Sequence, residues 1–151
     1  MNIQKFTQKS VEAINNCEKL AYDYGNQEIE QEHLFYSLLT LDDSLILKLL
    51  TKMGISKELI TNEAQQKLAG LTKVSGSSQV YISNDLNKVL INAEDESKAM
   101  GDEYVSVEHL FLSLLAHPSK EVKALFKQCQ ITKERFFQVL SQVRGNQRVT
   151  S

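Results

Sequence analysis

The sequence has few of the residues that interrupt helices. Its 151 residues include one proline and six glycines. Proline removes a backbone donor and glycine costs conformational entropy, so their scarcity leaves room for long helices. Hydrophobic residues make up 42% and charged residues 24%, a balance that is ordinary for a globular domain and argues against disorder. The length fits one domain with one core.

Two further absences exclude whole classes of partner. No apolar run reaches the roughly 18 residues that cross a bilayer, and the opening MNIQKFTQKS lacks the apolar stretch of a secretory signal. We therefore predict a cytoplasmic protein with no membrane partner. The formal net charge is −2 and the basic residues do not cluster. Because phosphate neutralisation needs a clustered basic surface, we expect no nucleic-acid partner.

Signatures of catalysis are also missing. The chain contains no GxxxxGK[ST], GxGxxG, HExxH or GxSxG motif. Its two cysteines, Cys17 and Cys129, form no CxxC pair and no zinc-like cluster, so a disulfide framework has little support. We predict no catalytic residue, no metal site and no cofactor in this chain, which makes a stand-alone enzyme the least favoured hypothesis.

The main positive feature is an internal repeat. Glu32-His33-Leu34-Phe35 recurs 76 residues later as Glu108-His109-Leu110-Phe111. The same offset, without a gap, matches Asn16 with Asn92, Glu18 with Glu94, Gly25 with Gly101, Leu49 with Leu125, Ile55 with Ile131 and Lys57-Glu58 with Lys133-Glu134. The period is too long for a solenoid. It predicts an all-α fold of two four-helix repeats related by a pseudo-two-fold axis.

Helix ends fall in register in the two repeats. Thr7 and Ser83 are predicted N-caps of the first helices, and Gly25 and Gly101 are predicted to end them. The EHLF motifs open the second helices, and the predicted N-caps of the third and fourth helices are Ser44, Ser119, Ser56 and Thr132. The predicted apolar faces of the fourth helices are Leu59, Ile60 and Ala64 in repeat one and Phe136, Leu140 and Val143 in repeat two. These signals place repeat one at 1–68, a glycine- and serine-rich linker at 69–80, and repeat two at 81–145.

The repeated histidines and the cysteines have simple structural interpretations. His33 and His109 each follow a glutamate directly, and neighbouring side chains on a helix point about 100° apart. We therefore predict packing histidines and not a metal or acid–base pair. Cys17 aligns with Ala93 and Cys129 with Met53, which predicts that both thiols are reduced core residues.

Glu32 and Glu108 lie in the first turn of a predicted helix in both repeats. Carboxylates there favour the helix dipole, which explains them without a ligand. Alternatively, they receive a cationic group of a partner, such as a guanidinium, in two related sites. Both interpretations stay open at this point.

The seam between the two repeats is a second candidate site. Ala13, Val89, Leu90 and Leu110 either belong wholly to the core or line a groove where the repeats meet. A partly exposed apolar seam would receive extended or unfolded peptide segments.

Together these residues resemble the N-terminal domain of the Clp heat-shock ATPases, which carries an EH[LI] motif in each of two helical repeats. The resemblance covers essentially the whole chain. Residues 80–115 (VYISNDLNKVLINAEDESKAMGDEYVSVEHLFLSLL) and 143–151 (VRGNQRVTS) are more similar to the ClpB disaggregases than to ClpC or ClpA unfoldases. The resemblance implies an eight-helix module over residues 1–145 that recruits unfolded or aggregated polypeptide.

The resemblance also implies a larger parent protein. We expect this chain to be a monomeric fragment of a homohexameric AAA+ ATPase, with ATP and Mg²⁺ bound in modules that are absent here. Residues 146–151 are expected to begin a flexible connection to those modules. Adaptor proteins are further expected partners.

The family's functional positions map onto this sequence one by one. Thr7 matches a threonine implicated in substrate handling, and Leu90 and Leu110 match apolar positions around the substrate groove. Ala13 occupies a groove position that is leucine in some relatives. The predicted substrate-binding set is Thr7, Ala13, Val89, Leu90, Glu108 and Leu110. The alternative is a ClpC-type adaptor-docking or phosphoarginine-reading domain, in which Glu32 and Glu108 match the residues that hold the modified arginine.

Overall fold

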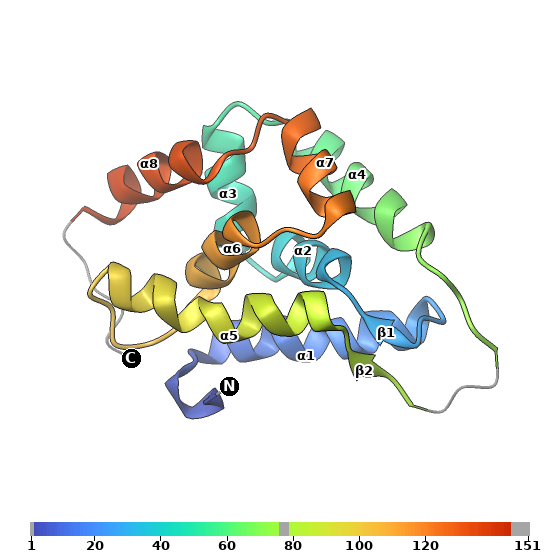
Figure 1. Cartoon of the computed structure of the whole chain (residues 1–151). Helices are drawn as coiled ribbons and strands as arrows, with labels where there is room; N and C mark the ends of the chain where they lie inside the picture. Colours follow the sequence, from blue (N-terminus) through green and yellow to red (C-terminus); the bar gives the residue numbers. More distant parts are fainter. Residues whose placement is uncertain (1, 76–78, 146–151) are drawn as a thin grey trace.

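The structure is a computed structural model that describes residues 2–75 and 79–145. Within these residues the chain forms eight α-helices, one 3₁₀ helix and two short strands (Figure 1). Repeat one contains η1 (Ile3–Lys5), α1 (Gln8–Asp23), β1 (Glu28–Ile29), α2 (Gln31–Thr40), α3 (Leu45–Lys52) and α4 (Lys57–Ala69). Repeat two contains β2 (Tyr81–Ile82), α5 (Asn84–Ala99), α6 (Val107–Ala116), α7 (Lys120–Gln128) and α8 (Lys133–Arg144).

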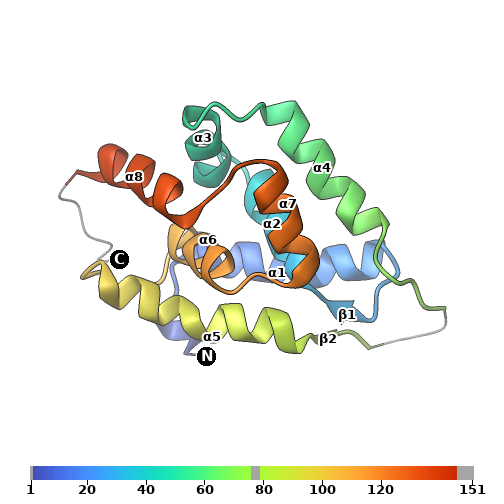
Figure 2. The ribbon, with the colours of Figure 1, turned by 45° about the horizontal axis from the view of Figure 1, so that its top comes forward.

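The two EH helices, α2 and α6, form the centre of the molecule. Figure 1 shows α1 and α5 on one side of them and α3, α4, α7 and α8 on the other. α1 packs on α2 as α5 packs on α6, and α2 and α6 also contact each other. Figure 2 shows α4 and α8 at opposite ends of the outer layer. The predicted eight-helix arrangement of two repeats is confirmed. None of the described helices is both long enough and apolar enough to cross a membrane.

The predicted helix ends are also confirmed. The Thr7 hydroxyl accepts a hydrogen bond from the Ser10 amide, and the Ser83 hydroxyl accepts one from Leu86. Gly25 and Gly101 have φ angles of 72° and 70°, the left-handed region that glycine enters without a steric penalty. The side chains of the four remaining predicted caps also accept backbone hydrogen bonds at the starts of α3, α4, α7 and α8: Ser44, Ser56, Ser119 and Thr132.

Short strands that the sequence did not reveal connect the two repeats. Ile29 of β1 pairs in parallel with Ile82 of β2, and Phe6 forms an isolated parallel bridge with Val105. The 76-residue offset relates Phe6 to Ile82 and Ile29 to Val105, so the two pairings are equivalent. Each repeat therefore supplies the extended segment that the other repeat pairs with. Two-residue strands are too short to show the alternation by which strands are recognised in a sequence.

Four phenylalanines join the repeats into one core. Phe35 and Phe111, from the two EHLF motifs, stack with ring centroids 5.9 Å apart. Phe126 meets Phe35 edge-on at 5.4 Å, and Phe136 lies 4.6 Å from Phe111. Aromatic pairs in these arrangements add to the stability gained from burial alone.

The cysteine prediction agrees with the structure. Cys17 is buried, Cys129 is half-buried against the core, and both thiols are free. Burial raises the pKa of the Cys17 thiol to about 12, so it stays protonated.

Two predictions about the fourth helices were wrong. Leu59 is 54% exposed and Val143 is 48% exposed, although both were assigned to apolar faces. In α4 the neighbouring Ile60 is fully buried, and Leu59 projects about 100° away from it around the helix, on a side that is open to solvent. In α8 the buried residues are Phe136 and Leu140, and Val143 lies in the last turn beyond them.

The described part of the predicted linker packs against repeat one. The Val74 amide donates to the Gly25 carbonyl at 2.9 Å, and the Asn26 side chain donates to the Thr72 carbonyl at 2.9 Å. The centre of the linker, residues 76–78, and the predicted connection at residues 146–151 lie outside the described residues.

Candidate functional site

Each EH histidine closes a capping box at the start of its helix. In repeat one, His33 Nδ1 accepts a hydrogen bond from the Glu30 amide at 2.8 Å. Its Nε2 must then carry the proton, and it donates to Asn26 Oδ1 at 2.8 Å. Burial lowers the pKa of His33 to about 4, so the ring is neutral near pH 7. The predicted packing role is confirmed, and the histidine also orders the chain that leads into α2.

The second repeat places a charged group behind its histidine. His109 Nδ1 accepts from the Ser106 amide at 2.9 Å, and Nε2 donates to Asp102 Oδ2 at 2.6 Å. Asp102 also accepts two hydrogen bonds from Arg144, at 2.6 and 2.8 Å. Burial lowers the pKa of His109, while its bond to Asp102 acts in the opposite direction. A bidentate ion pair thus fastens the end of α8 to the loop after α5.

Glu32 lines an acidic cavity. Its side chain lies in the first turn of α2 and is 8% exposed, beside a cavity of about 490 Å³. Burial is the main cause that raises its pKa to about 7, and the charges of Glu30, Glu121 and Asp85 add to the effect. Lys67 also lines the cavity. A cationic group entering here would relieve the repulsion between these carboxylates.

The surroundings of Glu108 are different. Glu108 is buried, and its carboxylate accepts a hydrogen bond from the Ser106 hydroxyl. Ser106 occupies the position equivalent to Glu30, and Lys9 occupies the position equivalent to Asp85. The acidic surroundings of Glu32 are therefore not repeated around Glu108. The two glutamates match in sequence but not in electrostatic environment.

Most of the predicted seam residues belong to the core. Ala13, Val89 and Leu110 have no exposed surface. The Ala13 and Val89 carbonyls accept equivalent hydrogen bonds from serine hydroxyls of α2 and α6, each at 2.7 Å. Thr7 is half-buried at the start of α1. The three apolar residues lie on α1, α5 and α6, and α1 and α5 both contact α6, but their side chains lie beneath the surface.

An apolar groove opens beside them. Leu90, together with Leu86, Ile14 and residues of η1 and β2, lines a hollow of about 230 Å³ between α1 and α5. Ile3 and Ile82 stand on its rim and are 46% and 40% exposed. Ile14 and Leu90 are equivalent in the two repeats, so the groove lies on the seam. We name this hollow the seam groove.

The rim residues were not predicted from the sequence. Ile3 and Ile82 precede the first helices, where no helical periodicity marks them. One sequence signal could have pointed to Ile82, namely an apolar residue just before a predicted N-cap, as Ile82 stands before Ser83. In repeat one the same signal points to Phe6, which stands before Thr7, and not to Ile3. Phe6 is 7% exposed and Ile82 is 40% exposed, although each pairs with an extended segment of the other repeat.

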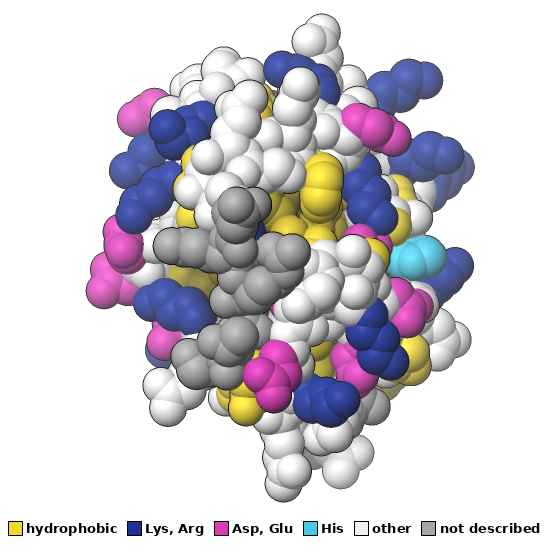
Figure 3. Space-filling model, turned by 90° about the vertical axis from the view of Figure 1, so that its left-hand side faces the viewer, with side chains coloured by type: hydrophobic (Ala, Val, Ile, Leu, Met, Phe, Trp, Pro, Cys, Tyr) yellow, Lys and Arg dark blue, Asp and Glu magenta, His cyan; other side chains and the backbone are white. Residues whose placement is uncertain are grey.

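Charge elsewhere on the surface is mixed. On the face at the C-terminal ends of α5 and α8, lysine and arginine side chains alternate with acidic ones around a small apolar patch (Figure 3). The described residues of this face form no continuous basic stripe of the kind that follows a nucleic-acid backbone.

These observations define the class of protein: an all-α domain made of two EH-motif repeats, with an apolar groove along their seam. The model of the Clp repeat N-terminal domain family matches residues 5–129, and the chain belongs to that family. It is similar over its whole length to the chaperone protein ClpB. It is 39% identical to ClpB of Clostridium tetani over 153 residues, covering 99% of this chain and 18% of that protein. It is 36% identical to ClpB of Nitratidesulfovibrio vulgaris, covering 100% and 18%.

Solved structures share the fold. The N-terminal domain of Hsp104 from Candida albicans superposes with a TM-score of 0.86 at 20% identity, covering 97% of this chain and 96% of that domain. A ClpV N-domain in complex with a VipB peptide gives a TM-score of 0.73 at 19% identity, covering 98% and 92%. The chain is therefore the N-terminal domain of a ClpB-like Clp chaperone. It spans about 18% of the length of these ClpB relatives.

Proposed function

We propose that this domain recruits unfolded or aggregated polypeptide to a ClpB-type, ATP-dependent disaggregase by holding apolar segments in the seam groove. The observation that carries the proposal is the exposure of Ile3 and Ile82 above a floor formed by Ile14, Leu86 and Leu90. Apolar side chains gathered around a hollow mark binding surfaces more often than isolated exposed ones do. The ClpV N-domain, which has the same fold, is known in complex with a peptide.

The size of the groove determines how it binds. A hollow of about 230 Å³ accommodates one or two apolar side chains and not a folded element. Such a contact buries little area, so binding is weak and exchanges rapidly. Rapid exchange suits a domain that must pass its ligand on.

The buried seam residues have a supporting role in this proposal. Ala13 and Val89 hold α1 and α5 against the EH helices, and Leu110 fills the layer between them. Leu90 touches the ligand from the groove floor, and Thr7 fixes the start of α1 through its cap. Glu108 is buried in the first turn of α6, where it accepts a hydrogen bond from the Ser106 hydroxyl, and it does not line the groove.

The wider setting follows from the ClpB relatives. We propose that the complete protein is a cytoplasmic homohexamer whose AAA+ modules bind ATP and Mg²⁺ and perform the work that this domain does not. Adaptor proteins and aggregates are then its partners. Sequencing the coding region beyond residue 151 tests this part, because two phosphate-binding loops are expected there.

An NMR titration tests the groove. The ligand is an uncharged peptide of leucine and phenylalanine with glycine and serine spacers, which cannot bind by charge. We expect shifts at Ile14, Ile82 and Leu90. The double variant Ile3→Thr/Ile82→Thr should weaken binding at least about threefold, because it removes the exposed rim while leaving the core intact.

A matched control comes from the exposed apolar residues outside the groove. Ile91→Thr/Val143→Thr removes two side chains of similar exposure from α5 and α8. It should leave peptide affinity unchanged. Shifts confined to other surfaces, or equal losses in the two double variants, would rule out the groove.

A second candidate function rests on the acidic cavity. Glu32 with Glu30, Asp85 and Glu121 forms a site for a guanidinium or phosphoarginine group, as in a ClpC-type reader or adaptor-docking domain. Calorimetry with a phosphoarginine peptide tests it. Glu32→Gln should abolish the heat of binding, while Glu108→Gln should retain most of it because Glu108 lacks the acidic neighbours. Absence of heat with the unaltered chain would reject this function.

A further inference from the structure

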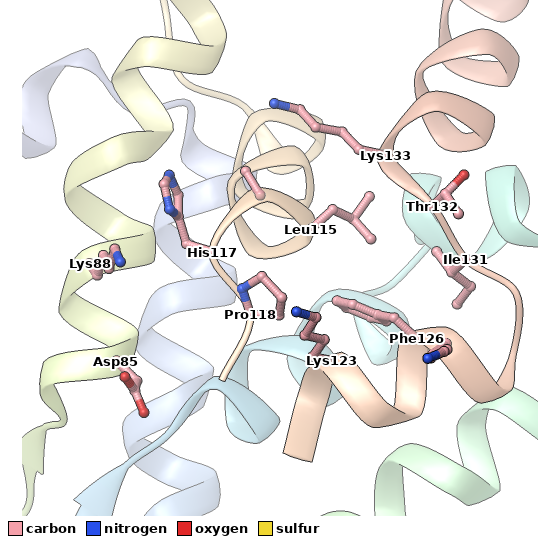
Figure 4. A pocket seen from close by; sticks show the side chains of 12 residues that line it. Asp85, Lys88, Leu115, His117, Pro118, Lys123, Phe126, Ile131, Thr132 and Lys133 are labelled. Carbon is pink, nitrogen blue, oxygen red and sulfur yellow. The ribbon is translucent and has the colours of Figure 1, made fainter. Parts of the chain in front are cut away.

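A larger cavity lies on the other side of α5. It has a volume of about 640 Å³ and is enclosed by α5, the α6–α7 connection, α7 and the start of α8 (Figure 4). Its apolar floor is formed by Leu115, Phe126 and Ile131. Phe126 and Ile131 are nearly buried, so they present a firm surface and not mobile side chains. The predicted binding residues do not include any of these.

Lysines surround the floor. Lys88 of α5 lies across the cavity from Lys123 and Lys127, which are one turn apart on α7. All three are exposed, and none forms an ion pair with another described residue. Lys133 differs, because its Nζ forms a salt bridge with Glu96 Oε2 at 2.8 Å. Three positive charges are thus uncompensated at the mouth of this cavity.

One carboxylate also lines the cavity. Figure 4 shows Asp85 at its edge, below Lys88. Asp85 also lines the acidic cavity, and it is the one carboxylate among the residues that line the cavity with the lysines. The cavity with the lysines therefore has a net positive charge.

The three lysines are not repeated at the equivalent positions of repeat one. The positions equivalent to Lys88, Lys123 and Lys127 in repeat one are Glu12, Leu47 and Thr51. Leu47 and Thr51 line an equivalent cavity of about 520 Å³. That cavity is lined by Lys48, which is paired with Asp43, by Lys52, and by Lys57, which is equivalent to Lys133. The three unpaired lysines around an aromatic floor are a feature of repeat two.

We propose that this cavity, the lysine pocket, binds an acidic segment of a partner polypeptide that carries one apolar side chain. The apolar side chain rests on Leu115, Phe126 and Ile131. Carboxylates on either side of it meet Lys88 on one wall and Lys123 and Lys127 on the other. Charge complementarity of this kind favours specificity and rapid association over high affinity.

The chemistry of the pocket fits a peptide better than a nucleic acid. Three lysines on two walls do not form a track for successive phosphates, and the net charge of the chain is −2. Phe126 is 4% exposed, which allows contact with an apolar side chain but does not present a whole ring face on which a base could stack.

The lysine pocket is independent of the seam groove. Leu86 and Leu90 face the groove from one side of α5, and Lys88 projects from the other side. The two surfaces can therefore be tested with different ligands, and failure of one proposal leaves the other standing.

Fluorescence anisotropy with three labelled peptides tests the proposal. The probe is an octapeptide with glutamate and aspartate on both sides of a single leucine. One comparison peptide replaces the leucine with glycine, and the other replaces every acidic residue with its amide. We expect the probe to bind most tightly and both comparison peptides to lose at least about fivefold in affinity. NMR shifts with the probe should include Leu115, His117 and Ile131.

Two triple variants with the same charge provide the control. Lys88→Gln/Lys123→Gln/Lys127→Gln removes the rim, and Lys9→Gln/Lys19→Gln/Lys98→Gln removes three exposed lysines elsewhere. Each changes the formal net charge from −2 to −5. The first should weaken probe binding at least about tenfold and the second by less than about twofold at 0.15 M salt. Equal losses in the two variants, equal binding of the glycine peptide, shifts confined to the seam groove, or tighter binding of a single-stranded RNA octamer would overturn the proposal.

Discussion

A single difference between the repeats changes what the buried histidine holds. Asn26 accepts from His33 in repeat one, and Asp102 accepts from His109 in repeat two. Only the aspartate can also form an ion pair with Arg144. The hydrogen-bond network around the histidine is therefore neutral in repeat one and contains an ion pair in repeat two.

Replacing Asp102 isolates the contribution of that ion pair. Asp102→Asn keeps an acceptor for His109 but leaves Arg144 without its carboxylate. We expect the free energy of unfolding to fall by about 3 kcal/mol, because removing one charge of a largely buried ion pair is strongly destabilising. Urea denaturation measures the change. Adding Arg144→Met to Asp102→Asn should recover much of the loss, and no recovery would assign the effect to His109 instead.

Glu32 should make stability depend on pH in an unusual direction. The pKa of Glu32 in the folded chain is about 7, above the ordinary value of 4.5. The stability that Glu32 contributes is therefore fully present below pH 4.5 and is lost as pH rises through 7. Glu32→Gln removes the cost of burying the charge. We expect the variant to exceed the unaltered chain in stability by on the order of 2 kcal/mol at pH 8 and to show little difference at pH 4.5.

His33 opposes this trend, and a control separates the two. The pKa of His33 in the folded chain is about 4, below the ordinary histidine value of 6.5. The stability that the neutral ring contributes is therefore present above pH 6.5 and is lost as pH falls towards 4. His33 is unchanged in Glu32→Gln, so its effect cancels in the comparison. The exposed Glu12→Gln should show no pH-dependent difference. Urea melts at pH 4.5, 6 and 8 measure all three chains, and a constant difference would contradict the assignment.

Among residues, local chemistry was predictable from the sequence and environment was not. The 76-residue offset identified Glu32 and Glu108 as a pair, because both occupy the same helical position. It did not reveal that Glu30, Asp85 and Glu121 surround only Glu32, since those neighbours come from three separate elements. A repeat in sequence fixes the equivalence of positions, and the side chains brought in by the fold determine their electrostatics.

At the scale of elements, the N-cap residues stabilise the helices. A loss of stability on replacing one of them could be mistaken for the loss of a ligand contact. Thr7→Ala removes the hydroxyl that accepts from the Ser10 amide and should lower the free energy of unfolding by about 1 kcal/mol. Thr7→Ser should be nearly neutral because the hydroxyl remains. Thermal unfolding followed by circular dichroism compares the two. If Thr7→Ala is as stable as the unaltered chain and still loses peptide binding, Thr7 contacts the ligand directly.

Element boundaries were predictable wherever capping chemistry marks them. The predicted caps of α1, α3, α4, α5, α7 and α8 accept backbone hydrogen bonds as expected. The strands were not predictable, because β1 and β2 have two residues each and pair across the repeats. Leu59 and Val143 show the related weakness of apolar spacing, which counts apolar residues without knowing how far a neighbouring helix reaches.

At the scale of the whole molecule, the repeats depend on each other. The phenylalanine cluster contains Phe35 from one repeat and Phe111, Phe126 and Phe136 from the other. The strand pairings also cross between repeats. Unfolding should therefore be one cooperative transition and not two.

Separating the repeats tests this dependence. Residues 1–75 expressed alone should lack a cooperative thermal transition and lose most of their helical circular dichroism signal, because Phe35 and β1 lose their partners. Mixing them with residues 76–151 should restore both signals. A cooperative melt of residues 1–75 alone would show that each repeat has a sufficient core of its own.

The crossed pairing of the entry segments limits how the two copies can diverge. Phe6 completes repeat two and Ile82 completes repeat one, so a change in the path of either backbone is felt by both copies. At the seam the copies differ mainly in the size of apolar side chains, as at Ala13 and Val89, whereas the lysines of α7 replace Leu47 and Thr51 and so change the charge of the surface. Each surface position of one repeat has an equivalent in the other. One of the two can therefore acquire a new side chain and a new binding role without altering the backbone that both repeats share.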